Sequence, residues 1–328
     1  MKTLLLRFWV IGFVLGICGV RAEEGVRWVR HGGEEGCLEL SNATTRVVLG
    51  PLRGGRVLSY RFHEQEALQQ APADPKRGSP RASMLPGGRF DVGPENLLPP
   101  HPVLWSGEWK AEITGDRAGR LSSKIDPATG LQLQRDFVLA PDGTRLRCTQ
   151  TMINRGDKRR NVFHWSRTFA PAGGTCAVPL NPESRYPLGY LVFSGKNTID
   201  FRPEPDDAVE TREGLLLIRS QPRFRKFAID ANEGWLAYVQ PGGLLFAKRF
   251  PVYSDRTYGE IAGNSVSIWY DSANAVEIEP IGPVEHLGPG ERASFTEEWS
   301  LHIAPRDPKG NTDWKALRER VSSLPFGQ

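Results

Sequence analysis

Two carboxylates stand two residues apart in the segment AVEIEPIG, at Glu277 and Glu279. If this segment forms a β-strand, both side chains point to one face of the sheet and that of Ile278 points to the other. Two like charges at this spacing tend to raise the pKa of one carboxyl group, which prepares it for general acid–base chemistry near neutral pH. The alternative is that this face of the strand lies in water and carries two solvated acids.

Two histidines are candidates to share proton transfer with these carboxylates, because an imidazole also titrates near neutral pH. His164 lies between two aromatic residues, and in a strand its side chain faces away from both. His101 lies between two prolines, which favour an extended backbone and present the side chain at a small entropic cost. The alternatives are a hydrogen-bonded core histidine for His164 and a surface-loop histidine for His101.

His101 belongs to the stretch DVGPENLLPPHPVLWSGEW, residues 91–109, which contains four prolines. Prolines at this density exclude a helix or a central strand and predict a long shaped loop. Its two indoles, Trp105 and Trp109, either line a site or pin the loop to the body of the protein, and we expect one of them in each role.

Several charged residues stand beside glycines or inside apolar runs. Each can hydrogen-bond the hydroxyl groups of a polar ligand or pair with an acidic one. The alternative for each is a structural ion pair. These residues are Arg56, Arg89, Glu95, Lys226 and Lys248.

The elements that must position these residues are mostly strands. Runs that alternate apolar and polar residues recur along the chain, and the tripeptides PDG (141–143) and PGG (241–243) mark two hairpin turns. About fifteen or more such strands predict an all-β fold, an antiparallel sandwich over residues 25–305. The one helix we expect is terminal, in TDWKALRERV after an N-cap at Asn311 or Thr312, and packed on the edge of the sandwich.

The polar segment 65–90, rich in Pro and Gly, interrupts these strands. Strands of the same kind stand on both sides of it, so we expect a long insertion loop rather than a linker between two domains. Residues 23–328 are therefore expected to form a single domain with two long loops, 65–90 and 91–109.

The first 22 residues have the pattern of a secretory signal peptide. Lys2 and Arg7 precede an apolar run from Phe8 to Val20, and cleavage is expected after Ala22. The alternative is a membrane anchor, although the run is short for a spanning helix, which needs ~20 residues. We therefore expect an exported protein, periplasmic or secreted, with no membrane attachment after cleavage.

The charge of the chain argues against nucleic acid as a partner. The 328 residues carry a formal net charge of +4. Loss of residues 1–22 removes three basic residues and no acidic one, which leaves a net charge of +1. The remaining basic residues are scattered rather than gathered in a patch, so we expect no nucleic acid partner.

Three cysteines remain after cleavage, namely Cys37, Cys148 and Cys176. In an exported protein they can form one disulfide and leave one thiol, or all three can be buried free thiols. Their spacing matches no zinc motif, and the chain has no phosphate-binding loop or nucleotide fingerprint. We expect no metal and no cofactor.

Four segments, taken in order, resemble the aldose 1-epimerase (galactose mutarotase) superfamily, and most closely a bacterial branch of it known only as a domain of unknown function. The segments are GPLRGGRVLSYRF, HPVLWSGEW, TQTMINRGDKRRNVFHWSRTF and AVEIEPIGPVEHLGPGERASFTEEWSL. The resemblance spans roughly residues 35–305 and implies a β-supersandwich with a sugar-sized cleft on one sheet. The chain departs from the family at HPV, where the epimerases have His-Gly-Gly, and at FHWSRTF, where they have a longer run.

The resemblance also implies roles for the candidate residues. Mutarotation needs one group that takes the proton of the anomeric hydroxyl and another that gives a proton to the ring oxygen. By the family's pattern Glu279 is the base, since it precedes a proline, and His164 or His101 is the acid. In such a cleft Trp105 and Trp109 are platforms for the apolar faces of sugar rings. The other expected substrate-binding residues are Arg56, Arg89, Glu95, Lys248 and Glu277.

Three functions follow as hypotheses. The leading one is an exported carbohydrate-binding protein whose cleft recognises a sugar or sugar acid. The second is an aldose epimerase-type enzyme without metal or cofactor, and the third is a structural envelope protein with an empty cleft. We expect loop 91–109 to fold over one sheet so that His101 and at least one indole share a pocket with His164 and Glu279. The pattern predicts no particular sugar and no particular oligomeric state.

Overall fold

A computed structural model of the chain describes residues 25–70, 87–195, 198–271 and 275–327. The expected signal peptide lies outside the described residues. In the part of the chain that is described, no helix is both long enough and apolar enough to span a membrane.

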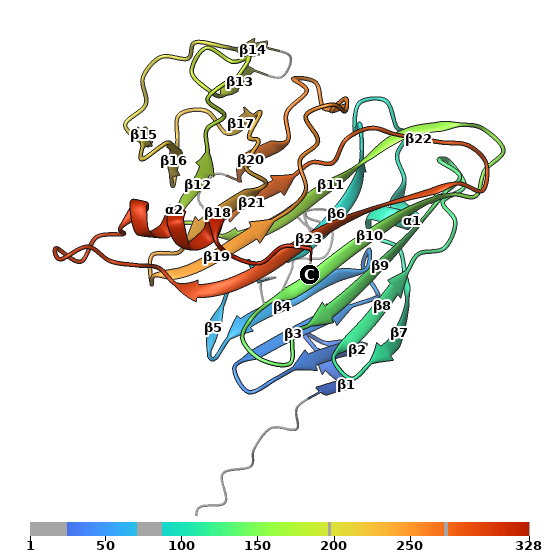
Figure 1. Ribbon diagram of the computed structural model, residues 1–328. Coiled ribbons are helices and arrows are strands. Elements are labelled where there is room, and N and C mark those ends of the chain that lie inside the picture. Colours follow the sequence, from blue (N-terminus) through green and yellow to red (C-terminus); the bar gives the residue numbers. More distant parts are fainter. Residues whose placement is uncertain (1–24, 71–86, 196–197, 272–274, 328) are drawn as a thin grey trace, which may run out of the picture.

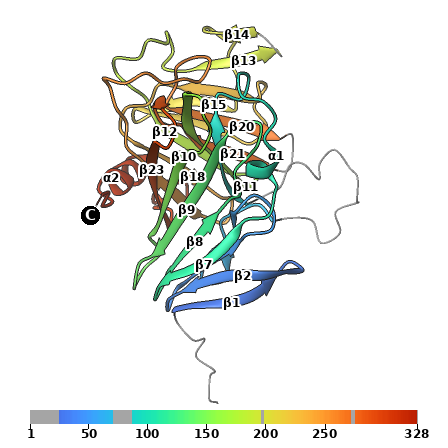
Figure 2. The ribbon, with the colours of Figure 1, turned by 90° about the vertical axis from the view of Figure 1, so that its right-hand side faces the viewer.

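The described strands form two antiparallel sheets, drawn in Figures 1 and 2. The thirteen-stranded sheet contains, in spatial order, β1 (Gly25–His31), β2 (Glu34–Ser41), β3 (Thr45–Gly50), β4 (Arg56–Phe62), β6 (Gly88–Gly93), β11 (Arg160–Pro171), β21 (Ala275–Pro280), β20 (Val266–Asp271), β17 (Lys226–Ile229), β13 (Leu191–Gly195) and β14 (Thr198–Asp200), with β5 (Gln65–Glu66) on β4 and β22 (Glu285–Leu287) on β11. The ten-stranded sheet contains β15 (Val209–Arg212), β16 (Leu215–Arg219), β12 (Thr175–Pro179), β18 (Trp235–Val239), β19 (Leu244–Arg249), β23 (Arg292–Ile303), β10 (Leu146–Asn154), β9 (Leu131–Leu139), β8 (Ala118–Ser122) and β7 (Lys110–Gly115).

Alternation along the strands explains why the two sheets pack together. In β9 the odd-numbered residues from Leu131 to Leu139 are buried, while the residues between them are partly or fully exposed. The inward side chains of both sheets join in one large apolar cluster, where the Trp299 ring stacks on Phe90 at 5.6 Å and meets Phe246 edge to face at 5.3 Å. The expected antiparallel sandwich is confirmed, and its two hairpin turns join β9 to β10 and β18 to β19.

The two expected loops contain more regular structure than their composition suggested. Within 65–90, β5 pairs with β4, and β6 begins at Gly88 in the middle of the thirteen-stranded sheet. Residues 71–86 lie outside the described part. Within 91–109, β6 continues to Gly93, and Pro102–Trp105 form the short helix α1. A helix was not expected here, but proline is well tolerated in the first turn, where its missing N–H has no partner to lose.

The terminal helix α2 (Trp314–Ser322) begins one or two residues later than expected, with Asp313 as its N-cap. The Asp313 carboxylate accepts a hydrogen bond from the backbone N–H of Ala316 at 3.0 Å. The sequence suggested that this helix packs on the edge of the sandwich. In the structure it does not pack on an edge strand. Leu317 and Val321 lie one turn apart and pack on small and apolar side chains of β12, β18 and β19, so α2 covers the outer face of the ten-stranded sheet (Figure 1).

The three described cysteines are all free and buried. Of the two alternatives that their number allowed, the structure has three free thiols. Burial raises the pKa of Cys37 to about 11 and that of Cys176 to about 12, so both are neutral thiols at ordinary pH.

Candidate functional site

The outer face of the thirteen-stranded sheet carries a row of charged and aromatic side chains. On β11 the odd-numbered residues point outward, and Arg167 lies directly opposite Arg89 of β6. On the other side, Phe169 lies opposite Glu277 of β21. Because directly opposed residues share a face, these side chains gather on one surface.

The same row continues across the next two strands. Trp269 of β20 lies opposite Glu277, and Lys226 of β17 lies opposite Trp269. Glu279 stands two residues after Glu277, so it points the same way, whereas Ile278 belongs to the core between the sheets. The expectation that the two glutamates share one face is met.

This row and the loop above it enclose a cavity of about 300 Å³, called here the first cavity. Pockets for small molecules are typically ~300–1,000 Å³, so this volume suits a ligand of roughly monosaccharide size. The residues that line the first cavity are Arg89, Glu95, Trp105, Arg167, Phe169, Lys226, Trp269, Glu277 and Glu279.

Arg167 is the central cation of the first cavity. Its Nε donates to Glu277 Oε1 at 2.8 Å, and its Nη1 lies 3.6 Å from the exposed carboxylate of Glu95. Its guanidinium carbon also lies 4.8 Å from the ring centroid of Trp165 and 5.0 Å from that of Trp105. Arg167 therefore holds one of the two strand glutamates as a paired carboxylate.

Glu279 has a different environment from Glu277. It is buried, and its Oε2 accepts a hydrogen bond from the Trp165 indole N–H at 2.7 Å. Burial, and then the negative charge of Glu277, raise the pKa of Glu279 to about 8. At pH 7 this carboxyl group therefore holds a proton that an ordinary glutamate would have lost.

The indole of Trp105 reaches the first cavity from α1. The guanidinium of Arg89 stacks on its ring, with 3.2 Å between Cζ and the ring centroid, and Arg89 Nη2 donates to the Trp105 carbonyl at 2.8 Å. These contacts fix the indole in place at the cavity wall. Trp269, which is half-buried on β20, supplies a second indole on the same surface.

Trp109 anchors the loop to the body of the protein, which is the second role expected for its indoles. It is 5% exposed, and its ring packs against Gly55, where a Cβ atom would come within 2.4 Å of it. The Arg135 guanidinium carbon lies 4.2 Å from its ring centroid. Trp109 therefore pins the end of loop 91–109 to the body of the protein and does not line the first cavity.

His101 lies near the first cavity without lining it. Its Nε2 is 3.0 Å from Asp91 Oδ1, and its Nδ1 is 2.9 Å from the Pro99 carbonyl oxygen. Burial disfavours the charged ring, but the hydrogen bond to Asp91 and the charge of Asp91 outweigh burial and raise the pKa of His101 to about 9. His101 immediately precedes α1 and Asp91 belongs to β6, so this ion pair holds the loop against the sheet.

His164 points into the protein, away from Glu279. It alternates with Phe163 and Trp165, which face outward, so the same strand carries it to the opposite face of the sheet. Its Nε2 is 2.7 Å from Glu297 Oε1, and Gln150 Nε2 lies 3.1 Å from its Nδ1. Burial lowers the pKa of His164 despite the charge of Glu297.

Lys248 belongs to the same interior group as His164. Its Nζ donates to Ser166 Oγ at 2.8 Å and to Thr168 Oγ1 at 2.7 Å, and lies 3.2 Å from Glu297 Oε2. We call Gln150, His164, Ser166, Thr168, Lys248 and Glu297 the inner cluster. Arg56 is likewise buried outside the first cavity, where its Nε donates to the Arg53 carbonyl at 2.9 Å.

The structure thus gathers six of the candidates at the first cavity, namely Arg89, Glu95, Trp105, Lys226, Glu277 and Glu279. The candidates that it places outside the lining are Arg56, His101, Trp109, His164 and Lys248. The sequence patterns did not point to Arg167, Phe169 and Trp269, which also line the first cavity. Alternation contained a signal for Arg167, because residues 163, 165 and 167 share the face opposite to His164. Among the described residues, no group of three or more His, Cys, Asp or Glu side chains is arranged to hold a metal ion.

Comparison with known proteins agrees with this architecture. No protein-family model matches the chain, and no curated protein is significantly similar in sequence. Among solved structures, a candidate aldose 1-epimerase from Escherichia coli K12 has a TM-score of 0.59 at 12% identity and covers 85% of this chain and 100% of its own.

Two further structures are similar in the same way. A galactose mutarotase-like protein from Lactobacillus casei has a TM-score of 0.57 at 11% identity, covering 81% of this chain and 100% of its own. Another from Clostridium acetobutylicum has a TM-score of 0.54 at 11% identity, covering 85% and 98%. The resemblance that four segments of the sequence suggested is therefore confirmed at the level of structure: this chain has the galactose mutarotase-like fold.

Proposed function

We propose that the chain is an exported carbohydrate-binding protein whose first cavity takes a sugar or a sugar acid. The observation that carries this proposal is the lining of the cavity. Indoles stand beside closely spaced carboxylates and cations on one sheet face, in a space of about 300 Å³. Sugars present apolar ring faces and many hydroxyl groups, which fit such a mixture of aromatic and charged side chains.

The charges favour an acidic or neutral sugar over a basic one. Arg89, Arg167 and Lys226 are cations, and Glu95 and Glu277 are carboxylates. Glu279 holds a proton at pH 7, so the lining has more positive than negative charge. A carboxylate on the ligand would meet these cations at the cavity wall.

Binding is tested by calorimetry of the mature protein with a panel of neutral monosaccharides and uronic acids. We expect saturable binding of at least one sugar. Arg167→Met, which removes the central cation, should weaken it about tenfold or more, whereas Arg159→Met, at an exposed turn, should not. Absence of binding across the panel, or equal binding by both variants, would contradict the proposal.

A second candidate, epimerase-type turnover, is favoured by the unequal surroundings of Glu277 and Glu279. Neighbouring carboxyl groups in different environments are the usual arrangement for an acid and a base. In this scheme protonated Glu279 gives its proton to the ring oxygen while Glu277 takes the proton of the anomeric hydroxyl. The bond between the anomeric carbon and the ring oxygen breaks, a carbonyl forms, and reversal closes the ring on either face.

Turnover and binding separate in the variant Glu279→Gln. The amide keeps the shape of the side chain but cannot transfer a proton, so it should keep most sugar binding and abolish anomer exchange measured by NMR. Exchange that survives in this variant would remove Glu279 from the chemistry. Exchange absent from the wild-type protein, together with saturable binding, would leave the binding function alone.

We also propose that the chain is exported and that residues 23–328 form a single domain. The leader pattern supports cleavage after Ala22, and mass spectrometry of the extracytoplasmic fraction should find a chain that begins at Glu23. An intact chain retained in the membrane would contradict export. The apolar cluster shared by both sheets supports one folding unit, for which we expect a single unfolding transition by two spectroscopic probes.

A further inference from the structure

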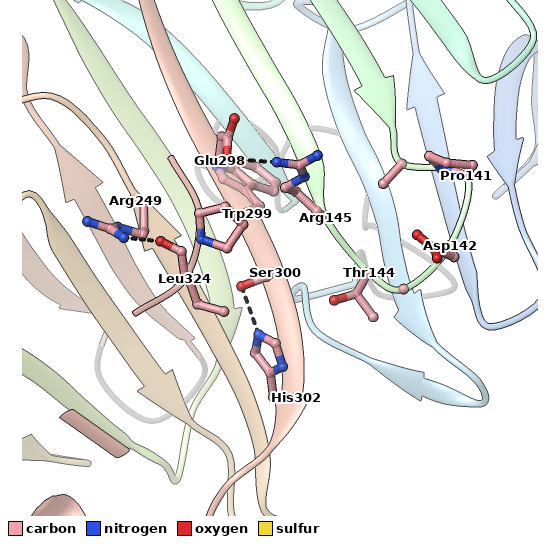
Figure 3. Close-up of a pocket in the computed structure, with 13 residues that line it drawn as sticks. Pro141, Asp142, Thr144, Arg145, Arg249, Glu298, Trp299, Ser300, His302 and Leu324 are labelled. Atoms are coloured by element: carbon pink, nitrogen blue, oxygen red, sulfur yellow. Dashed lines mark hydrogen bonds and ion pairs between the residues drawn. The ribbon is translucent and has the colours of Figure 1, made fainter. Parts of the chain in front are cut away.

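A second cavity lies on the outer face of the ten-stranded sheet, whereas the first cavity is on the thirteen-stranded sheet. Its volume is about 370 Å³, again in the range of ligand pockets. The floor is β23, from which Glu298, Ser300 and His302 point outward (Figure 3). The β9–β10 hairpin forms one wall, and the segment that follows α2, with Leu324 and Pro325, forms the other.

Glu298 is buried in this floor with half of its carboxylate unsatisfied. Its Oε1 accepts a hydrogen bond from Arg147 at 2.9 Å, but its Oε2 has no hydrogen-bond partner. Arg145 Nη1 lies 3.9 Å from Oε2, which is beyond hydrogen-bond distance. Since a buried carboxylate oxygen without a donor costs free energy, a hydroxyl group that enters the cavity would satisfy it.

A buried donor without an acceptor lies on the neighbouring strand β19. Arg249 lies directly opposite Glu298 in the pairing of β19 with β23, so both side chains share the outer face. Its Nη1 is held by the carbonyl groups of Ser322 and Leu324, while its Nε has no acceptor. A hydroxyl group can donate or accept, so different hydroxyl groups of one ligand can serve Glu298 Oε2 and Arg249 Nε.

Arg145 supplies a partly exposed cation at the rim of the second cavity. Its side chain is 39% exposed, and within the described part of the chain its one charged partner is Glu298 at 3.9 Å. The planar guanidinium suits a carboxylate, which it can hold through two parallel hydrogen bonds. Arg145 and Arg249 line the cavity together with Glu298 and the exposed Asp142, and Arg147, which is paired with Glu298, adds a third cation beside them.

We propose that the second cavity binds a small hydroxylated carboxylate of the uronic acid type, independently of the first cavity. The ligand carboxylate pairs with Arg145. One ligand hydroxyl donates to Glu298 Oε2, and another accepts from Arg249 Nε. The apolar side chains of Leu324 and Pro325 cover the CH face of the ligand.

The test is an NMR titration of the mature protein with sodium glucuronate. We expect saturable shifts of the backbone amides of Thr144, Ser300 and His302. Arg145→Gln should weaken the affinity tenfold or more. Arg159→Gln, which removes the same charge from an exposed turn at the other end of β10, should leave the affinity within twofold of wild type.

Two other probes and one other variant complete the test. Glucose offers hydroxyl groups without a carboxylate and acetate offers the reverse, so each should bind at least tenfold more weakly than glucuronate. Trp269→Ala, at the first cavity, should leave the glucuronate shifts at Ser300 and His302 unchanged. The proposal is overturned if these amides show no saturable shift, if Arg145→Gln behaves like Arg159→Gln, or if glucose or acetate binds as tightly as glucuronate.

Discussion

Strand β11 carries a polar cluster on each of its faces. The two clusters differ in how completely their polar groups are paired within the protein and shielded from solvent. In the inner cluster, His164, Lys248 and Glu297 use protein partners on every side and are sealed between the sheets. At the first cavity, Arg167 and Glu277 pair with each other beside an open space. A closed network specifies the packing of a core, whereas an open one can exchange its partners for a ligand.

The largest expected effect is on the inner cluster. Lys248→Met leaves the buried carboxylate of Glu297 without its main cation, and it should lower the free energy of unfolding by about 3–5 kcal/mol. Lys226→Met makes the same chemical change at the partly exposed edge of the first cavity. The ion pair of Lys226 with Glu260, at 3.8 Å, contributes ~1 kcal/mol or less to the free energy of unfolding. Urea denaturation of both variants tests the contrast, and equal losses would erase it.

The next effect separates the indoles by role. Trp105→Ala and Trp269→Ala should each weaken sugar binding in the first cavity by about 1–3 kcal/mol, because each removes an aromatic wall. Trp109→Ala should instead lower stability by about 3–5 kcal/mol and leave the affinity of the folded protein close to that of wild type. Calorimetry and urea denaturation of the three variants together assign each ring. A Trp109→Ala protein of full stability and lost affinity would reverse the assignment.

The third effect follows from the pKa of Glu279. The folded protein holds this proton up to about pH 8, whereas an unfolded glutamate releases it near pH 4.3, so stability should fall as pH rises through that window. The slope from this group is at most ~1.4 kcal/mol per pH unit, and Glu279→Gln should remove it. Denaturation at pH 5, 7 and 8.5 compares the two proteins. Parallel curves would show that Glu279 is an ordinary carboxylate.

The smallest effect concerns two imidazoles. In an NMR titration the ring of His101 should change charge near pH 9, because Asp91 favours the imidazolium. The ring of His164 should titrate below the range of an ordinary histidine, because burial lowers its pKa. His101→Asn and His164→Gln assign the two signals. A His164 ring that titrates like an ordinary histidine would show that the inner cluster is open to water.

The sequence predicted the fold better than the site. Alternating strands, two hairpin turns and the shared face of Glu277 and Glu279 are local properties, which periodicity of two reveals directly. The location of α2 was not predictable in this way, because an amphipathic helix shows which face it buries but not which sheet it packs on. Alternation within 163–167 already implied that His164 and Trp165 face opposite ways. It could not reveal which face was inside, since both faces of β11 are buried.

The first cavity depends on residues that meet only through long-range pairing. Arg89, Arg167, Glu277, Trp269 and Lys226 come from five different strands. Their register is set by the packing of the whole sheet, so no local pattern placed Arg167 between a carboxylate and two indoles. The resemblance to the epimerases drew attention to His164 and His101 instead, at positions that line no part of the first cavity.

We infer that the open cluster, rather than the closed one, is where this protein binds its ligand. A crystal of the mature protein soaked in a mixture of monosaccharides and uronic acids tests this most directly. We predict a sugar ring in the first cavity, against Trp105 or Trp269, with hydroxyl groups or a carboxylate within hydrogen-bond distance of Arg167 and Glu277. An empty first cavity at sugar concentrations that saturate the protein in solution would show that the ligand binds elsewhere.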